Sequence, residues 1–356
     1  MTELKTGGQH GYLRIATEEA FMPEEAIDLY AEVLDGPDPD PGFVSLWGFY
    51  LRSTDERSRF IRESLIDLGA RRLADMDARG IDRQIIALTA PGTQILRTDK
   101  AVALARLAND QLGEACLAHP DRFTGMAACA PQDGAEAAKE IERAVHKYGM
   151  RAVIINSHIN GEYLDNPKFY PVLEAAEALD IPIYIHPNTP SRDMIRPMLD
   201  VGLDGAIFGF GVETGMHALR LITTGTIDRF PKLQIIIGHM GEALPYWMYR
   251  LDYMHRAGVK AGRYEAMKPL KKEKISDYLR ENYTITNSGM AWEAAIKFAQ
   301  ENLGIDRVMY AMDYPYQCPA EEVAALDAMH MSAADKKKFF QTNAERVFKL
   351  DGQGAG

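Results

Sequence analysis

Short runs of apolar and β-branched residues alternate along this chain with longer segments of a different periodicity. Eight of the runs have the length and composition of strands. They are Tyr12–Ala16, Ile81–Leu88, Phe123–Ala128, Arg151–Asn156, Ile181–His186, Leu233–Gly238, Tyr283–Thr286 and Arg307–Met312. Strands that are separated by helices indicate a parallel sheet.

The segments between most of these runs have apolar residues spaced about 3.6 positions apart, which predicts helices. They are Glu63–Ala78, Ala101–Ala118, Ala135–Tyr148, Pro171–Leu179, Gly215–Thr224, Glu242–His255 and Trp292–Glu301, followed by two C-terminal helices near Ala320–Met329 and Ala333–Phe348. Eight strand–helix units predict an α/β fold of the (β/α)₈ TIM-like barrel type, with residues 1–356 as a single domain. A doubly wound open sheet is the competing fold, but no GxGxxG follows the first strand.

The segment from Phe21 to Arg62 is unusually long for a connection between a strand and its helix. It contains the sequence GPDPDPG at residues 36–42, and then Trp47, Tyr50 and Arg57. Loops of this length in compact domains are usually functional or disordered. The aromatic and arginine content predicts a structured lid loop over residues 21–62.

Composition and charge narrow the class of protein. The 356 residues are 46% hydrophobic and 26% charged, and the net charge of −11 argues against a nucleic-acid-binding surface. The three cysteines, Cys116, Cys129 and Cys318, are far apart, which predicts reduced thiols in a cytoplasmic protein. We expect no signal peptide and no membrane span, because no apolar run reaches about 18 residues.

Acidic residues and histidines follow several predicted strands, at the end of a barrel where catalytic residues project. Glu18 follows the first strand and His186 ends the fifth. His239 and Glu242 follow the sixth in GHMGE, and Asp313 follows the eighth in MDYPY. Carboxylates and imidazoles are ligands for a divalent cation such as Mn²⁺ or Zn²⁺.

Taken in order, the Glu-bearing first strand, IHP, GHMGE and MDYPY resemble the amidohydrolase superfamily, specifically its decarboxylase branch. The resemblance runs from the first strand to Phe348. In that family the first strand usually carries HxH or ExH, whereas this chain has Glu18 and Ala20 at the matching positions. This departure resembles the 5-carboxyvanillate decarboxylases. No lysine ends the fourth strand, so the bridging ligand of binuclear relatives is absent.

The resemblance implies one divalent metal, Mn²⁺ in the first place and Zn²⁺ as the alternative, held by Glu18, His186 and Asp313. It implies decarboxylation of an ortho-hydroxy aromatic acid, with 5-carboxyvanillate giving vanillate and CO₂. Three residues would have catalytic roles: Asp313 as proton donor, and His239, oriented by Glu242, as a hydrogen-bond donor to the substrate. The residues that would bind the substrate are Tyr50, Arg57, Arg250 and Tyr316. Relatives form dimers or tetramers, so we also expect a homo-oligomer.

Other interpretations stay open at this point. Glu18 and Glu19 are also compatible with a solvated acidic pair, Asp313 with a helix cap, and Glu242 with a charge at a helix N-terminus. The substrate could instead be γ-resorcylate or 2,3-dihydroxybenzoate. The same fold hosts metal-dependent hydrolases such as lactonases and amidases, and a barrel with a degenerate site would have no activity. Metal content and turnover distinguish these alternatives.

Overall fold

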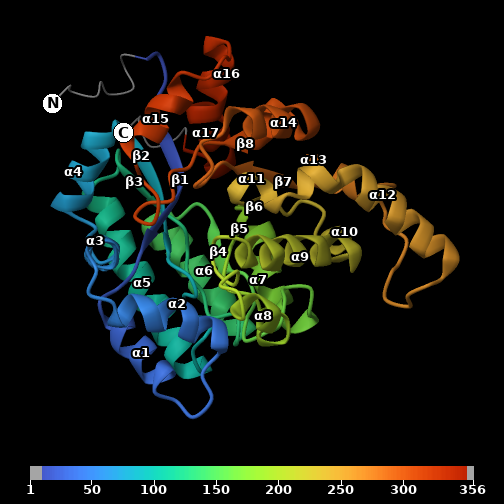
Figure 1. Cartoon of the computed structure of the whole chain (residues 1–356), viewed down its shortest axis with the longest axis horizontal. Coiled ribbons are helices and arrows are strands. Elements are labelled where there is room, and N and C mark those ends of the chain that lie inside the picture. Colours follow the sequence, from blue (N-terminus) through green and yellow to red (C-terminus); the bar gives the residue numbers. More distant parts are fainter. Residues whose placement is uncertain (1–9, 351–356) are drawn as a thin grey trace.

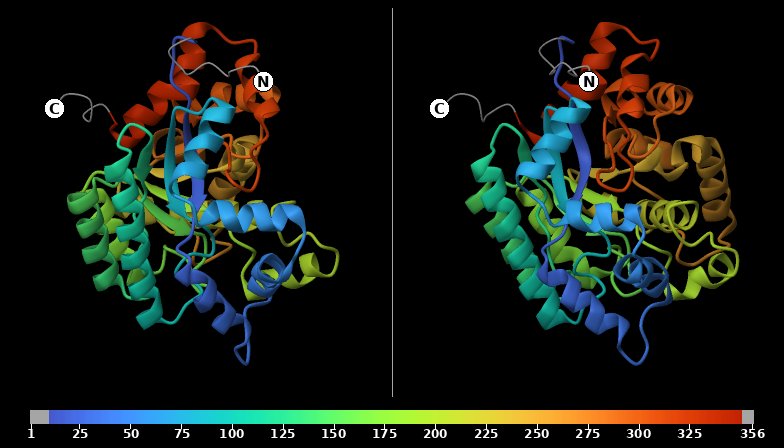
Figure 2. Two further views of the ribbon diagram at one scale, coloured as in Figure 1. Left: turned by 90° about the vertical axis from the view of Figure 1, so that its left-hand side faces the viewer. Right: turned by 60° about the vertical axis from the view of Figure 1, so that its left-hand side comes forward.

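A barrel of eight parallel strands surrounded by helices forms the centre of the computed structural model, which describes residues 10–350 (Figures 1 and 2). The strands are β1 (Ile15–Phe21), β2 (Arg83–Leu88), β3 (Phe123–Gly125), β4 (Val153–Asn156), β5 (Ile183–His186), β6 (Ile235–Ile237), β7 (Tyr283–Thr286) and β8 (Val308–Met309). Parallel ladders join β1 to β3 into one sheet and β4 to β8 into a second sheet.

Backbone contacts at two seams join these sheets into a barrel. Between β1 and the segment that follows β8, the Thr17 N–H donates to the Tyr310 carbonyl at 3.1 Å. At the other seam, a parallel bridge pairs Ala127, just after β3, with Val153 of β4. The predicted α/β barrel is therefore confirmed.

Helices cover the outside of the barrel and extend beyond both of its ends (Figure 2). The α-helices are α1 (Glu25–Leu34), α2 (Pro41–Arg52), α3 (Glu56–Leu65), α4 (Ala70–Arg79), α5 (Thr98–Ala118), α6 (Gly134–Tyr148), α7 (Tyr170–Ala178), α8 (Arg192–Leu199), α9 (Gly209–Thr223), α10 (Thr226–Arg229), α11 (His239–Glu242), α12 (Leu244–Ala261), α13 (Ile275–Glu281), α14 (Glu293–Leu303), α15 (Ala320–Asp327), α16 (Ala333–Lys337) and α17 (Asn343–Phe348). Shorter helices are η2 (Pro167–Phe169), η3 (Ile305–Arg307) and η4 (Lys338–Thr342), of which η4 is a π-helix. No described helix is long and apolar enough to cross a membrane.

The first and last strands differ most from their predicted ranges. β1 begins at Ile15 and continues to Phe21, so the polar residues after Ala16 lie within the strand and not beyond it. The pairing of β1 with β2 shifts register between Ala16 and Glu19, which is a local irregularity of the bulge type. β8 has only two residues because the backbone beyond Met309 forms its hydrogen bonds elsewhere.

The single helix predicted over Glu63–Ala78 is wrong, because the chain forms α3 and α4 with a break between them. Asp67 stabilises the break: its Oδ1 accepts from the N–H groups of Gly69 and Arg72, at 2.9 and 3.1 Å. Side-chain bonds of this kind compete with helical hydrogen bonds and end helices.

The lid predicted as a loop over residues 21–62 is mostly helical, since it contains α1, α2 and the first part of α3. The residues between Leu34 and Pro41 form the longest connection between these helices. Asp40 caps α2 by accepting from the N–H groups of Gly42 and Phe43. Trp47 of α2 is 1% exposed and donates from Nε1 to the Ala90 carbonyl at 2.8 Å, which anchors the helix beside the barrel.

Candidate metal centre and active site

Glu18 of β1 lies inside the C-terminal end of the barrel, with a side chain that is 5% exposed. Its two carboxylate oxygens have different surroundings. Oε2 accepts hydrogen bonds from the hydroxyls of Tyr184 and Thr286. Oε1 is buried and has no hydrogen-bond partner among the described residues. A buried carboxylate oxygen without a partner is energetically costly, so Oε1 marks a position where a cation would be stabilised.

Two imidazoles face this oxygen. Nε2 of His186, at the end of β5, lies 3.3 Å from Glu18 Oε1, and Nε2 of His239, at the start of α11, lies 3.6 Å from it. Nδ1 of His186 lies 2.8 Å from the Pro187 carbonyl, which can only accept. Nδ1 therefore carries the proton, and the Nε2 of a neutral His186 ring presents a lone pair. Two lone pairs facing one another at 3.3 Å are the donor arrangement that a divalent metal requires.

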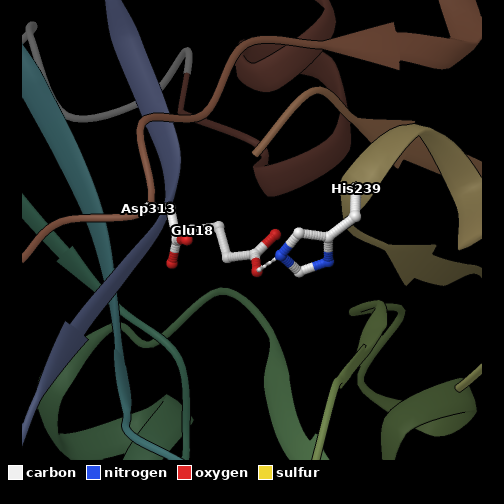
Figure 3. Close-up of side chains that lie close together, drawn as sticks. All are labelled: Glu18, His239 and Asp313. Carbon is white, nitrogen blue, oxygen red and sulfur yellow. Dashed lines mark ion pairs between the residues drawn. The ribbon is translucent and has the colours of Figure 1, made fainter. Parts of the chain in front are cut away.

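Asp313 completes the cluster from the segment after β8. Ligand atoms of Glu18, His239 and Asp313 all lie within 4.8 Å of one another, and Figure 3 shows these three side chains converging from β1, α11 and the segment after β8. His186 adjoins Glu18 but lies outside this group of three. The described residues thus offer four candidate ligands, one more than the three predicted from the sequence.

Glu242 holds the His239 ring in place through a hydrogen bond. Nδ1 of His239 donates to Glu242 Oε1 at 2.9 Å, which aims Nε2 toward Glu18. Burial would lower the pKa of His239, but the surrounding carboxylates of Glu18, Glu242 and Asp313 outweigh it and raise the pKa to about 10. Burial lowers the pKa of His186 and His239 lowers it further, against the opposing effects of Glu18 and of the hydrogen bond to Pro187. Without a metal, therefore, His239 is the charged ring and His186 the neutral one.

The pKa of Asp313 is raised to about 8, chiefly by burial and further by Glu18, against the opposing charges of His239 and Arg57. A carboxyl group in this environment retains its proton more readily than an exposed one. Burial also raises the pKa of Glu19 to about 8, although the N–H groups of Met312 and Tyr314 lower it. The site therefore gathers several carboxyl groups in a space too small for all of them to be charged without a cation.

Glu18, His186 and Asp313 line a small cavity, and three of the four predicted substrate-binding residues gather near it. Tyr316 forms a 2.7 Å hydrogen bond with Thr89, which lines the cavity. The Tyr50 ring packs edge-on against Tyr316 with the ring centroids 6.0 Å apart. Arg57 donates from Nη2 to the Tyr316 carbonyl at 3.0 Å. The lid helices α2 and α3 thus meet the segment after β8 beside the site.

Arg250 is placed differently. It lies on α12, and its exposed side chain forms no hydrogen bond or ion pair with any residue between 10 and 350. Figure 1 shows α12 extending away from the barrel. Its predicted contact with substrate therefore stays a prediction.

Sequence reasoning missed several residues that hold the site together. Tyr184 and Thr286 satisfy one oxygen of Glu18, and Glu19 accepts hydrogen bonds from the backbone on either side of Asp313. The alternation of a strand was the available signal for Tyr184, because residues two apart on a strand share a face with one another, here Tyr184 and His186. No comparable signal existed for Glu19, since its partners lie about 290 residues away in the sequence.

Comparison with known proteins gives matches over nearly the whole chain. The family model described as amidohydrolase matches residues 55–350. Gamma-resorcylate decarboxylase from a Rhizobium species is 37% identical over 348 residues, which cover 95% of this chain and 99% of that protein.

Two crystal structures extend the comparison. That of 5-carboxyvanillate decarboxylase from Novosphingobium aromaticivorans, complexed with manganese and 4-hydroxy-3-methoxy-5-nitrobenzoic acid, is 60% identical with a TM-score of 0.96 and covers 98% of this chain and 99% of that one. The dihydroxybenzoic acid decarboxylase from a Polaromonas species, with bound manganese and 2-nitroresorcinol, is 34% identical with a TM-score of 0.83, covering 96% and 98%. The resemblance inferred from the motifs is thereby confirmed, and this chain belongs to the amidohydrolase family.

Proposed function

We propose that this protein catalyses the metal-dependent, non-oxidative decarboxylation of an ortho-hydroxy aromatic acid, with 5-carboxyvanillate as substrate and vanillate and CO₂ as products. The observation that carries the proposal is the buried Oε1 of Glu18, which has no hydrogen-bond partner among the described residues and faces two imidazoles at the C-terminal end of the barrel. The 60% identity with a 5-carboxyvanillate decarboxylase supports the choice of substrate.

Glu18, His186 and Asp313 would hold one divalent metal. Manganese is our first choice because the structures of two relatives contain it, and zinc is the alternative. When bound, the metal would supply Lewis acidity and a fixed point for the phenolic oxygen and carboxylate of the substrate. His186 suits this set because the Pro187 carbonyl holds its Nδ1 proton and leaves a lone pair on Nε2, whereas the surrounding carboxylates raise the pKa of His239 to about 10 and favour its charged form.

Asp313 would deliver the proton that the reaction consumes. Direct loss of CO₂ would leave an unstable aryl carbanion, so protonation of the ring carbon bearing the carboxylate comes first. An electron pair from the ionised phenol oxygen moves into the ring as the Asp313 proton forms a bond to that carbon. The C–C bond then breaks, its electron pair restores the aromatic ring, and CO₂ leaves. General acid catalysis of this kind contributes about 10²- to 10⁴-fold.

The other residues would bind and orient the substrate. His239, held by Glu242, would donate a hydrogen bond to the substrate oxygens. The Arg57 guanidinium would pair with the distal carboxylate, for which its planar fork is suited, and Tyr50 and Tyr316 would contact the ring and its methoxy group. Arg250 would assist with the distal carboxylate. Fixing the reactants in this way lowers the barrier by several kcal/mol, on the order of the known effects of orientation.

An absorbance assay tests the function directly. Purified protein is treated with chelator, divided, and incubated with 5-carboxyvanillate in the presence or absence of added Mn²⁺. Formation of vanillate only with Mn²⁺ is the expected result. Protein that contains bound Mn²⁺ and forms no vanillate would rule out this substrate.

Gamma-resorcylate is the second candidate substrate, because four gamma-resorcylate decarboxylases are 34% to 37% identical to this chain over about 95% of its length. Incubation of the same protein with both acids, each at several concentrations, compares kcat/KM directly. We expect the higher value for 5-carboxyvanillate.

We also propose that the protein is a cytoplasmic homo-oligomer, a dimer or a tetramer. Large aromatic side chains on α12 support self-association: Tyr246, Tyr249 and Tyr253 are 77%, 85% and 55% exposed, and Trp247 is 48% exposed. Aromatic residues are enriched at protein interfaces. Sedimentation analysis of the wild-type protein and a Tyr249→Ser variant tests this, and a wild-type monomer at micromolar concentration would contradict it.

A further inference from the structure

Glu19 adjoins Glu18 in the sequence but bonds to a different part of the site. Its Oε1 accepts from the Met312 N–H at 3.0 Å, and its Oε2 accepts from the Tyr314 N–H at 3.1 Å. These two backbone groups flank Asp313. The Glu19 carboxylate thus accepts hydrogen bonds from the backbone on both sides of Asp313, the candidate acid.

The segment around Asp313 needs such support because its regular pairing has ended. β8 stops at Met309, four residues before Asp313. Asp313 has a positive φ of 74°, in the left-handed region that residues with a Cβ atom rarely adopt. Residues in such conformations persist only when their surroundings hold them there. The Tyr314 N–H that bonds to Glu19 lies in the peptide group directly after this strained residue, and the Met312 N–H lies one residue before it.

Other buried side chains in turn hold Glu19 in place. It is 1% exposed, and Nε2 of Gln84 on β2 lies 3.5 Å from its Oε2. The orientation of the Gln84 amide is set by Arg72, which is fully buried and donates from Nη1 to Gln84 Oε1 at 3.2 Å. Arg72 also donates to the Ala20 carbonyl, next to Glu19 in β1. Buried polar groups are costly unless they are hydrogen-bonded, and Glu19, Gln84 and Arg72 all are.

We propose that Glu19 is a positioning residue, whose carboxylate fixes the location of the Asp313 carboxyl group by holding the Met312 and Tyr314 N–H groups. Adjacent residues of β1 would then have different roles. Glu18 would face the candidate metal, and Glu19 would hold Asp313 across the seam between β1 and the segment after β8. The effect on turnover rests on the proposed decarboxylation, but the effect on metal affinity does not.

The test compares the manganese-loaded wild-type protein with Glu19→Gln. A glutamine retains one accepting oxygen but places an NH₂ group against the second backbone N–H, so it cannot hold both sides of Asp313. We expect Mn²⁺ affinity, measured by calorimetry on the chelator-treated proteins, to fall about 10- to 100-fold. We expect kcat to fall by a similar factor, with KM changed less than about threefold, at saturating Mn²⁺.

A Glu19→Asp variant separates positioning from charge. It retains the negative charge but is one methylene shorter, so it should not restore Mn²⁺ affinity or kcat. Recovery of wild-type values in Glu19→Asp would overturn positioning in favour of charge alone. This variant also provides the test if Glu19→Gln does not fold.

Asp327→Asn is the matched control. Asp327 is a structural carboxylate that pairs with the fully buried Arg14 ahead of β1, at the opposite end of the strands from the site. It should lower the unfolding temperature and leave Mn²⁺ affinity and kcat unchanged. A folded Glu19→Gln protein with wild-type Mn²⁺ affinity would overturn the inference, whether or not 5-carboxyvanillate is the substrate. Wild-type protein that binds Mn²⁺ but does not decarboxylate would reject only the proposed function.

Discussion

Arg57 of α3 donates a hydrogen bond to the backbone carbonyl of Tyr316, so the lid helices are attached to the segment that carries Asp313. Only one guanidinium nitrogen is used in this bond, and the remaining N–H groups of Arg57 are available to a ligand. Arg57 also lowers the pKa of Asp313, which places its charge within electrostatic reach of the candidate acid. The same side chain can thus hold the lid and pair with a substrate carboxylate.

Replacement of Arg57 with lysine should therefore weaken substrate binding more than it affects chemistry. Lysine keeps the positive charge but cannot bind a carboxylate through two parallel N–H groups. We expect KM for 5-carboxyvanillate to rise about tenfold, which corresponds to about 1.4 kcal/mol of lost binding free energy. Arg59→Lys, an exposed position on the same helix, is the control. An unchanged KM in Arg57→Lys would remove Arg57 from the substrate site.

Asp313→Asn should abolish turnover while leaving substrate binding largely intact. Asparagine is similar in size and still offers an oxygen to a metal, but it has no acidic proton to deliver. We expect kcat to fall at least about 10³-fold, within the range known for loss of a general acid. Steady-state kinetics measures kcat, and calorimetry with an unreactive substrate analogue measures binding. Turnover within tenfold of the wild-type rate would show that another group supplies the proton.

The two histidines should differ in their effect on metal binding. His186 presents an Nε2 lone pair to Glu18, and burial lowers its pKa, whereas Glu18, Glu242 and Asp313 raise the pKa of His239 to about 10. We expect His186→Ala to lose most of its Mn²⁺ affinity and His239→Ala to lose mainly kcat. A thermal-shift titration measures this, since a ligand at 100 times its Kd stabilises a protein by about 2.7 kcal/mol. A stabilisation by Mn²⁺ that survives in His186→Ala and vanishes in His239→Ala would reverse the assignment.

Sequence reasoning located the barrel and named residues that the structure brings together, because both follow from local patterns. Strand runs such as Ile235–Ile237 are short and apolar, and a barrel gathers the residues after each strand at one end, which placed Glu18, His186 and Asp313 together. The interaction partners of these residues could not be predicted in the same way. Tyr184 and Thr286 meet Glu18 only because closure of the barrel turns the inner faces of β5 and β7 toward β1.

In the lid, by contrast, a local pattern led to the wrong prediction. Residues 36–42 suggested a long loop because proline, glycine and aspartate favour turns. Yet proline is well suited to the first turn of a helix and aspartate to its cap, and Asp40 and Pro41 begin α2 in these roles. The buried Trp47 then fixes α2 against the barrel through tertiary contacts that no local pattern encodes.

Away from the site, His217 of α9 is a buried neutral histidine. It is fully buried, and its Nε2 accepts a hydrogen bond from the Leu164 N–H at 3.2 Å. Its Nδ1 has no partner among the described residues. Burial lowers the pKa of His217 to about 3, and the charges of His158 and Arg220 lower it further in the same direction. Protonation would remove the acceptor at Nε2 and place a charge in a dry environment.

His217 should consequently make the protein less stable in mild acid. Its ordinary pKa of 6.5 applies to the unfolded chain, so between pH 6.5 and about 3 the unfolded state binds one more proton than the folded state. Stability is therefore full above pH 6.5 and decreases as the pH falls, by about 1.4 kcal/mol per pH unit well inside this window. His217→Gln keeps an acceptor for Leu164 and has no titrating ring. We expect the free energy of unfolding, measured with urea on metal-free protein at pH 7.0, 6.0 and 5.0, to fall less steeply in His217→Gln than in the wild type. Parallel pH profiles for the two proteins would show that His217 is protonated in the folded state as readily as in the unfolded chain.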